Sequence, residues 1–363
     1  MNNQNLYVDI NVLQTVPSSN INRDDTGAPK TAIYGGVTRS RVSSQSWKRA
    51  VRKAFGKQSD GADWLEGIRT TRGPLLLANK MQELNNDLSD EEALNKAIDV
   101  FNKSKIKLDK KTNRTKALLM LSNGQLEKLA KYTLENDELD GKAIKKALQS
   151  DHSLDMALFG RMVADDPSLN VDAACQVAHA ISTHEIVPEF DYYTAVDDKK
   201  EDEESGSAMI GTIEYDSATL YRYANVNVNE LIHNLGDTDV AAGGLGLFIK
   251  NFIMSMPTGK QNTFANKTVP QYVLITVRPD TPVNLVSAFE EPVKSRNGYV
   301  QPSVKRLEEE YQKTQTFVEK PLATYILTNE NSEISDQVAD IDDLVDSVVK
   351  TIETRVSDEN SND

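Results

Sequence analysis

The sequence has very few of the residues that form covalent cross-links and transition-metal sites. It contains one cysteine, Cys175, and four histidines among 363 residues. A single thiol excludes an internal disulfide framework and a zinc site with four thiolates. His179 and His184 are five positions apart, which differs from the four-residue spacing of a helical zinc-protease motif. This cysteine usage favours a reducing compartment, and we expect a cytoplasmic protein.

Long apolar runs are also missing. No stretch approaches the roughly 18 apolar residues of a membrane-spanning helix, and the first residues are polar and uncharged, unlike the cationic start of a signal peptide. We therefore expect neither membrane association nor export.

Catalytic motifs are scarce as well. Pro257–Gln261 (PTGKQ) resembles a fragment of a phosphate-binding loop, but it lacks the early glycine and the Ser or Thr after the lysine. Gly243–Gly246 (GGLG) lacks the dinucleotide-binding spacing, so a hinge or close packing is the better interpretation. Only the adjacent Asp24 and Asp25 have the chemistry to hold magnesium with substrate phosphates; loop capping or an ion pair with Arg23 is the favoured alternative. The sequence thus predicts a non-catalytic protein without a metal or cofactor.

Charge is present in quantity but is unevenly distributed. There are 41 basic and 55 acidic residues, a net charge of −14, and the segments 197–204 and 330–363 together account for −13 of it. The remainder is nearly neutral and contains two basic islands. The first, Arg39–Lys57, has seven basic residues and no acid, and the second, Lys103–Lys116, has seven basic residues and one acid. Such islands can follow a phosphate backbone.

The first island is predicted to contain a helix from Gln45 to Phe55, capped by Ser43 or Ser44. Its N-terminus would direct free N–H groups and the positive end of the helix dipole toward a phosphate. One face then carries an amide and three cations at helical spacing: Gln45, Lys48, Arg49 and Arg52. A merely solvated basic face is the alternative interpretation.

Hydrophobic periodicity predicts the order of the elements. A half-buried strand at Leu6–Val12 precedes a long loop to Arg41, and residues 63–149 have the pattern of an all-helical insertion. A helix over 171–183 follows, and then a hairpin with arms Phe190–Val196 and Met209–Tyr215 around an exposed acidic tip, Asp197–Ser207.

The last part of the chain mixes strands and helices. We predict a strand at Leu220–Val228, helices at Asn229–Leu235 and Leu245–Ser255, and a buried strand at Tyr272–Val277. An apolar stripe from Ile341 to Ile352 indicates a terminal helix docked on the core, in preference to a separate partner-binding helix. Strands alternating with outer helices favour an α+β fold.

Eight short segments, in order, resemble motifs of one family, the CasC-type backbone subunit of the type I-E CRISPR surveillance complex Cascade. They lie between residues 1 and about 305, and the helical insertion and the last fifty or so residues have no matching motif. The segments are Asn22–Asp25 (NRDD), Ala32–Gly36 (AIYGG), Arg41–Ala50 (RVSSQSWKRA), Gly160–Met162 (GRM), Ala178–His184 (AHAISTH), Thr194–Asp198 (TAVDD), Tyr221–Asn225 (YRYAN) and Gly298–Ser303 (GYVQPS).

The resemblance implies an RRM-like (ferredoxin-like) palm with an inserted all-helical fingers domain and a β-hairpin thumb. The implied boundaries are 1–58 for the first part of the palm, 59–175 for the fingers, 176–189 for a palm helix, 190–216 for the thumb, and 217–363 for the rest of the palm with an acidic C-terminal helix and tail.

The function implied by the resemblance is binding of CRISPR RNA. Copies of the chain would form a helical filament along the guide, kink it at regular intervals and support its pairing with target-strand DNA. Implied partners are the other Cascade subunits, namely the large subunit, the small subunit, the guide 5'-end subunit and the guide-processing endoribonuclease.

The resemblance also implies the residues that contact RNA. They form a groove of Arg23, Lys30, Arg41, Ser43, Gln45, Lys48, Arg49, Arg52, Lys260, Gln261, Lys294 and Arg296. Met162 matches a residue that wedges against bases, with core filling as its alternative role. Tyr192 and Tyr193 match an aromatic pair of the thumb, where Trp and Phe also occur in the family. Val37 and Thr38 replace basic residues, which makes the early loop less basic than is usual.

Two other functions stay open. Related backbone subunits cleave RNA with an aspartate in an early loop, and Asp24 or Asp25 lies in a comparable place, so a metal-dependent endoribonuclease is one alternative. A general single-stranded RNA-binding protein with an RRM-like core is the other, and it would not require a repeat-derived guide.

Overall fold

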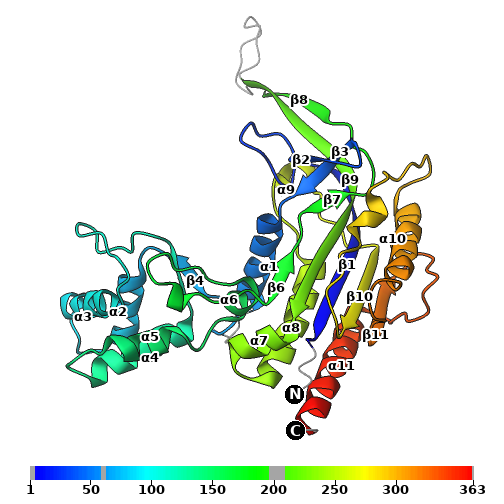
Figure 1. The fold of residues 1–363 in the computed structure, drawn as a ribbon. Helices are drawn as coiled ribbons and strands as arrows, with labels where there is room; N and C mark the ends of the chain where they lie inside the picture. The colour runs from blue at the N-terminus through cyan, green and yellow to red at the C-terminus, as the bar shows by residue number, and fades with distance from the viewer. Residues whose placement is uncertain (1–4, 59–62, 196–208, 362–363) are drawn as a thin grey trace, which may run out of the picture.

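The computed structural model describes residues 5–58, 63–195 and 209–361. Its centre is an antiparallel sheet of nine strands in the order β11, β10, β1, β9, β7, β3, β2, with β6 and β8 also paired to β9 (Figure 1). The predicted α+β class is confirmed. The strands are β1 (Tyr7–Ser19), β2 (Thr31–Tyr34), β3 (Val37–Val42), β6 (Cys175–Val177), β7 (Ala180–Ser182), β8 (Glu189–Ala195), β9 (Met209–Asn227), β10 (Tyr272–Arg278) and β11 (Ala323–Thr328).

The central strand β1 is buried on both faces, so the prediction of a half-buried strand is wrong. Val8, Ile10 and Val12 pack into the main apolar core on one face. Asp9 and Asn11, which alternate with these apolar residues, are each only 1% exposed. Their polar groups are satisfied inside the protein, because the hydroxyl groups of two buried tyrosines of β9 donate to them at 2.6 and 2.8 Å. Alternation alone therefore identified the strand but not its burial.

Helices cover both faces of the sheet. The Val8 face carries α1 (Ser44–Gln58), α7 (Val228–Leu235), α8 (Thr238–Met254) and α11 (Ile341–Ser361), and the other face carries α10 (Val300–Thr314) and the 3-10 segment η2 (Leu285–Phe289). The docked terminal helix is confirmed, because Leu344, Val348 and Ile352 are buried. Across the described residues, no helix has the length and apolar content needed to cross a membrane.

The glycine-rich segment at 243–246 lies within α8 and serves close packing. A Cβ at Gly246 would lie 3.1 Å from side-chain atoms of both Val345 and Val349 on α11. Glycine therefore lets the two helices approach closely, as one of the two sequence interpretations proposed.

A helical unit with its own core projects from the sheet (Figure 1). It contains α2 (Gly73–Leu84), α3 (Asp90–Lys103), α4 (Asn123–Glu135) and α5 (Gly141–Leu148), and α6 (Leu154–Phe159) and η1 (Pro167–Leu169) lead back toward the sheet. The side chains of Ser122 and Asp140 cap the starts of α4 and α5. The unit is not all-helical as predicted: β4 (Ile68–Thr70) pairs with β5 (Leu119–Leu121), and strands of three residues are too short to show periodicity.

Two further expectations are wrong in the half of the sheet that contains β9, β7, β3 and β2. Residues 171–183 do not form a helix, and no palm helix occupies 176–189; this stretch contains β6 and β7, whose backbones pair with β9. Tertiary pairing with a long neighbouring strand overrides their local helical pattern. The expected loop to Arg41 is largely strand as well, because β2 and β3 form a hairpin in which Gly35 and Gly36 have φ of 59° and 79°, as a tight turn requires.

The expected long hairpin is present as β8 and the first part of β9, with Tyr192 opposite Thr212. Its return arm does not end before the next strand. The predicted segments 209–215 and 220–228 belong to one strand of 19 residues that runs from the hairpin into the centre of the sheet. The predicted acidic tip, Asp197–Ser207, lies outside the described residues.

Candidate nucleic-acid interface

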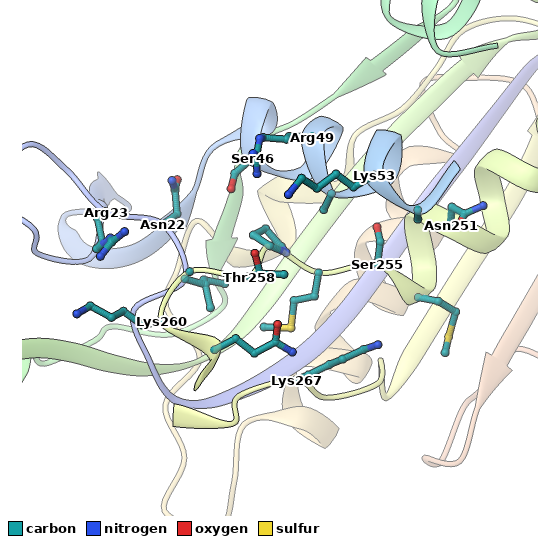
Figure 2. Close-up of a pocket in the computed structure, with 18 of the residues that line it drawn as sticks. Asn22, Arg23, Ser46, Arg49, Lys53, Asn251, Ser255, Thr258, Lys260 and Lys267 are labelled. Carbon is teal, nitrogen blue, oxygen red and sulfur yellow. The ribbon is translucent and has the colours of Figure 1, made fainter. Parts of the chain in front are cut away.

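A groove of about 850 Å³ lies between α1 and the segment that follows α8 (Figure 2). Residues 21–24, the exposed side of α1 and residues 254–261 form its walls. In Figure 2, Arg49 and Lys53 extend from α1, while Lys260 and Lys267 lie across from them. Six of the side chains that line the groove are basic: Arg23, Arg49, Lys53, Lys57, Lys260 and Lys267.

The residue spacing of α1 directs three of these cations into the groove. Arg49, Lys53 and Lys57 are four residues apart, so they form one row along the helix. A neighbouring row with the same spacing, Trp47, Val51 and Phe55, is buried. Because the apolar row docks the helix on the sheet, the basic row has a fixed direction.

The opposite wall depends on Gly259. A Cβ at this position would lie 2.3 Å from the carbonyl oxygen of Ile21, so glycine is needed for the two walls to come this close. The next residue, Lys260, has φ of 50° and precedes the short helix α9 (Gln261–Phe264). The segment Pro257–Gln261, which resembles part of a phosphate loop, is thus a wall of the basic groove.

The six groove cations are without an ion-pair partner in the part of the chain that the structure describes. Within the described ranges, no carboxylate oxygen lies within 4.0 Å of any of the six. Like charges that converge in a partly enclosed groove raise the local positive potential and attract a polyanion.

Asp24 is the acidic residue that lines the groove, and its carboxylate is used within its own loop. Oδ1 accepts hydrogen bonds from the backbone N–H of Thr26 (2.9 Å), the hydroxyl of Thr26 (2.7 Å) and the N–H of Ala28 (3.0 Å). These bonds, the Thr26 hydroxyl foremost, lower the pKa of Asp24. The loop-capping interpretation of Asp24 is confirmed.

The predicted RNA contacts are only partly brought together. Arg23, Arg49, Lys260 and Gln261 line the groove. Lys30 and Ser43 lie beside it, because their backbone N–H groups donate to the carbonyl oxygen and to Oδ1 of the groove residue Asn22, at 2.9 and 2.8 Å.

Arg41 and Gln45 lie near the start of α1. The guanidinium of Arg41 donates to the carbonyl of Thr31 (2.9 Å) and lies 3.2 Å from Nδ1 of His179. Gln45 is exposed. Lys294 and Arg296 are exposed on the loop before α10 and do not line the groove.

Lys48 and Arg52 lie on a different side of α1 from Arg49. Nε of Arg52 donates to Oδ2 of Asp155 at 2.6 Å, and Nζ of Lys48 lies 5.3 Å from the ring centre of Phe159. Both partners belong to α6. The single basic face predicted from sequence is therefore divided between a groove side and an α6 side.

Met162 is 81% exposed, which excludes the core-filling alternative. Its neighbours are anchored: Gly160 has φ of 78°, and the buried guanidinium of Arg161 donates to the carbonyls of Leu148 and Leu169 at 2.8 Å each. Burial lowers the pKa of Arg161 to about 10. The turn thus presents a flexible thioether on a fixed base.

Tyr192 and Tyr193 occupy opposite faces of the β8–β9 hairpin, because side chains alternate along a strand. Tyr193 is opposite Gly211, where an added Cβ would lie 2.4 Å from the tyrosine oxygen. Tyr192 is 64% exposed, and Phe190 on the same face is 66% exposed. The predicted aromatic pair cannot contact one ligand surface together.

Sequence reasoning did not assign Lys53, Lys57 and Lys267 to the site. The first two lie in the basic island, and the spacing of four from Arg49 was the signal that could have found them. Lys267 follows α9 in a stretch without periodicity, so no local pattern indicates it.

Comparisons with known proteins agree with this architecture. The profile of a family described as CT1975-like protein matches residues 8–351. A solved chain from a "CRISPR RNA-guided surveillance complex, pre-nicking" is similar, with 32% identity and a TM-score of 0.84 over 95% of this chain and 100% of that one. Another, from a "CRISPR RNA-guided surveillance complex", has 29% identity and a TM-score of 0.64 over 95% and 99% of the two chains. None of the curated proteins compared with the chain matches it.

Proposed function

The chain belongs to the CT1975-like protein family, and we propose that it acts in a Cascade-type CRISPR surveillance complex as a subunit that binds the guide RNA. The observation that carries this proposal is the groove lined by six cations, none of which has a carboxylate oxygen within 4.0 Å among the described residues. None of the side chains lining the groove is aromatic. Cations without a stacking platform suit phosphates rather than bases, so binding would be independent of sequence and would leave base edges free to pair with a target.

The finer assignments belong to the same proposal. The sheet with its covering helices would be the palm, the helical unit the fingers and the β8–β9 hairpin the thumb. Met162 and Tyr192 are exposed apolar side chains on two projecting parts, a placement suited to contacts with bases at a kink. Copies of the chain would repeat along one guide in a head-to-tail filament, with target-strand DNA and the other Cascade subunits as further partners.

We also propose that the chain is not itself a nuclease. The endoribonuclease alternative relies on Asp24 or Asp25 as a metal ligand. Three hydrogen bonds within its loop occupy Oδ1 of Asp24, which favours a structural role for this carboxylate. Incubation of the assembled complex with matched RNA and DNA in magnesium tests the point: we expect no cleavage, and cleavage lost in Asp24→Ala or Asp25→Ala would establish the alternative.

Sequencing the RNA that co-purifies with the full chain tests the main proposal. We expect spacer–repeat units in the wild type. The variant Arg49→Glu/Lys53→Glu should lose this RNA because both side chains line the groove, whereas Lys305→Glu/Lys313→Glu on α10 changes the net charge equally and should retain it. A mixture of cellular RNA without repeat sequence would instead establish a general RNA-binding protein.

A further inference from the structure

Two contacts at matching spacing join α1 to α6. Arg52 and Lys48 are four residues apart on α1, and their partners Asp155 and Phe159 are four residues apart on α6. Four residues correspond to about 6 Å of rise on each helix. The two helices therefore run antiparallel along this contact, and α1 holds α6 near both of its ends.

The Arg52–Asp155 contact is the stronger of the two. The Asp155 side chain is fully buried, and that of Arg52 is 22% exposed. Oδ1 of Asp155 also accepts from the N–H of Gly67 (2.8 Å) and the hydroxyl of Ser153 (2.6 Å), while Arg52 donates a second bond to the carbonyl of Gly67 (3.1 Å). A buried charge pair with its other hydrogen bonds satisfied fixes geometry strongly, because removing one partner leaves an unpaired charge.

The far end of α6 leads directly to Met162. Phe159, the last residue of α6, contacts Lys48 and packs edge-on against Phe248 of α8 at 6.1 Å between ring centres. Gly160 closes the helix by donating its N–H to the carbonyl of Met156 at 2.9 Å. A displacement of α6 must therefore move the Met162 turn as well.

We propose that Arg52, through Asp155, is a positioning residue that sets where Met162 stands relative to the basic groove. The proposal rests on the proposed function, in which Arg49 and Lys53 hold phosphates and Met162 contacts bases. The same helix, α1, positions both sets of residues. Arg49 and Lys53 extend from its groove side, and its other side holds α6, which leads to Met162. The distance along the RNA between a held phosphate and a disturbed base is thus fixed by a rigid joint within one subunit, and Arg52 acts without touching RNA.

An RNA-free experiment tests the joint itself. Spin labels at Met162→Cys and Asp239→Cys, the latter in the first turn of α8, report their separation by pulsed electron resonance; Cys175 is buried and does not compete for label. We expect one narrow distance in the otherwise wild-type chain and in Arg49→Gln, and loss of that narrow distance in Arg52→Gln. Unchanged distances in Arg52→Gln would overturn the proposal. If Arg52→Gln fails to fold, the neutral pair Arg52→Gln/Asp155→Asn removes both charges and serves as the second variant.

A second experiment uses the assembled complex on an in vitro transcript of the co-purified guide. Chemical probing should give the same altered nucleotide pattern in Arg52→Gln and Met162→Ala, while Arg52→Gln keeps the wild-type dependence of affinity on salt. Arg49→Gln should do the reverse, keeping the pattern and lowering the salt slope by about 0.7. If Met162→Ala changes the pattern and Arg52→Gln does not, the positioning role fails while the proposed function stands. A pattern unaffected by Met162→Ala refutes the base contact itself, and a slope reduced in Arg52→Gln shows that Arg52 binds phosphate.

Discussion

Neutralising two groove cations should weaken RNA binding in a way that depends on salt. We consider Arg49→Gln/Lys53→Gln, because both side chains line the groove and neither has an acidic partner in the described structure. Each phosphate contact to a single strand contributes about 0.7 to the slope of log affinity against log salt. With six cations in contact, the slope is about −4, and a rise from 50 to 200 mM salt weakens binding about 300-fold.

The variant has four groove cations left, so its slope should be about −3 and the same change in salt should weaken binding about 50-fold. Fluorescence anisotropy of a labelled guide, measured at several salt concentrations, gives both slopes. The control Lys305→Gln/Lys313→Gln removes two exposed charges from α10, on the other face of the sheet, and should keep the wild-type slope.

The slope distinguishes a direct contact from a general effect of charge. If the groove variant and the α10 control lose affinity equally, with parallel slopes, RNA responds only to net charge and the groove is not its site. If neither slope changes, the six cations form a solvated surface, and RNA must bind elsewhere on the chain.

Three further predictions concern stability and the hairpin. Burial raises the pKa of Asp9 to about 7 from 3.8, so the folded state favours the protonated carboxyl and the free energy of unfolding decreases as pH rises from 4 to 7. Urea titrations of the wild type, compared with Asp9→Asn, should show a loss of stability on the order of 2 to 3 kcal/mol between pH 5 and 7. Equal pH profiles of the two proteins would contradict the raised pKa. Tyr192→Ala should weaken guide binding by about 1 to 3 kcal/mol per stacked base without changing thermal stability, whereas Tyr193→Ala should chiefly increase proteolysis of the hairpin; the opposite pattern would exchange their roles. Gly259→Ala should lower the free energy of unfolding by about 1 to 3 kcal/mol, because the added methyl meets the Ile21 carbonyl; wild-type urea stability would show that the wall yields freely.

The sequence predicted the strands and helices whose local pattern coincides with their tertiary environment. The helix that ends at Gly236 and the terminal helix lie where periodicity and turn residues placed them. The helix predicted over residues 171–183 does not form, because the backbone groups of β6 and β7 pair with β9, a strand distant in sequence. The burial of Asp9 could not be predicted for the same reason. The chain near Val283, distant in sequence, covers its carboxylate, which accepts a hydrogen bond from the N–H of Val283 at 3.0 Å.

The sequence predicted which segment supplies basic residues to the site, but only part of how those residues are arranged in space. The acid-free island correctly indicated α1, yet its seven basic residues serve at least three purposes. Arg39 is fully buried and donates to the carbonyls of Ser182 (2.9 Å) and Phe289 (2.8 Å), so it joins β3 to β7 and η2. The cations of α1 form two rows. Arg49, Lys53 and Lys57, four residues apart, line the groove, whereas Lys48 and Arg52, also four residues apart, contact α6.

The role of each cation in this protein depends on the groups around it, and not on how many cations its segment contains. Arg222 illustrates the point: it is buried between the rings of Trp47 and Phe252, at 3.9 and 4.8 Å, and burial lowers its pKa to about 9. The guanidinium of Arg222, like that of Arg161, is buried and therefore inaccessible to a ligand. The groove cations differ because, among the residues that the structure describes, no carboxylate pairs with them, so an anion that enters the groove is attracted by all six. An acidic chain can therefore bind a polyanion, since the net charge of −14 lies mostly in segments remote in sequence from α1, while the local potential is set by six cations at one groove that have no ion-pair partner in the described part of the chain.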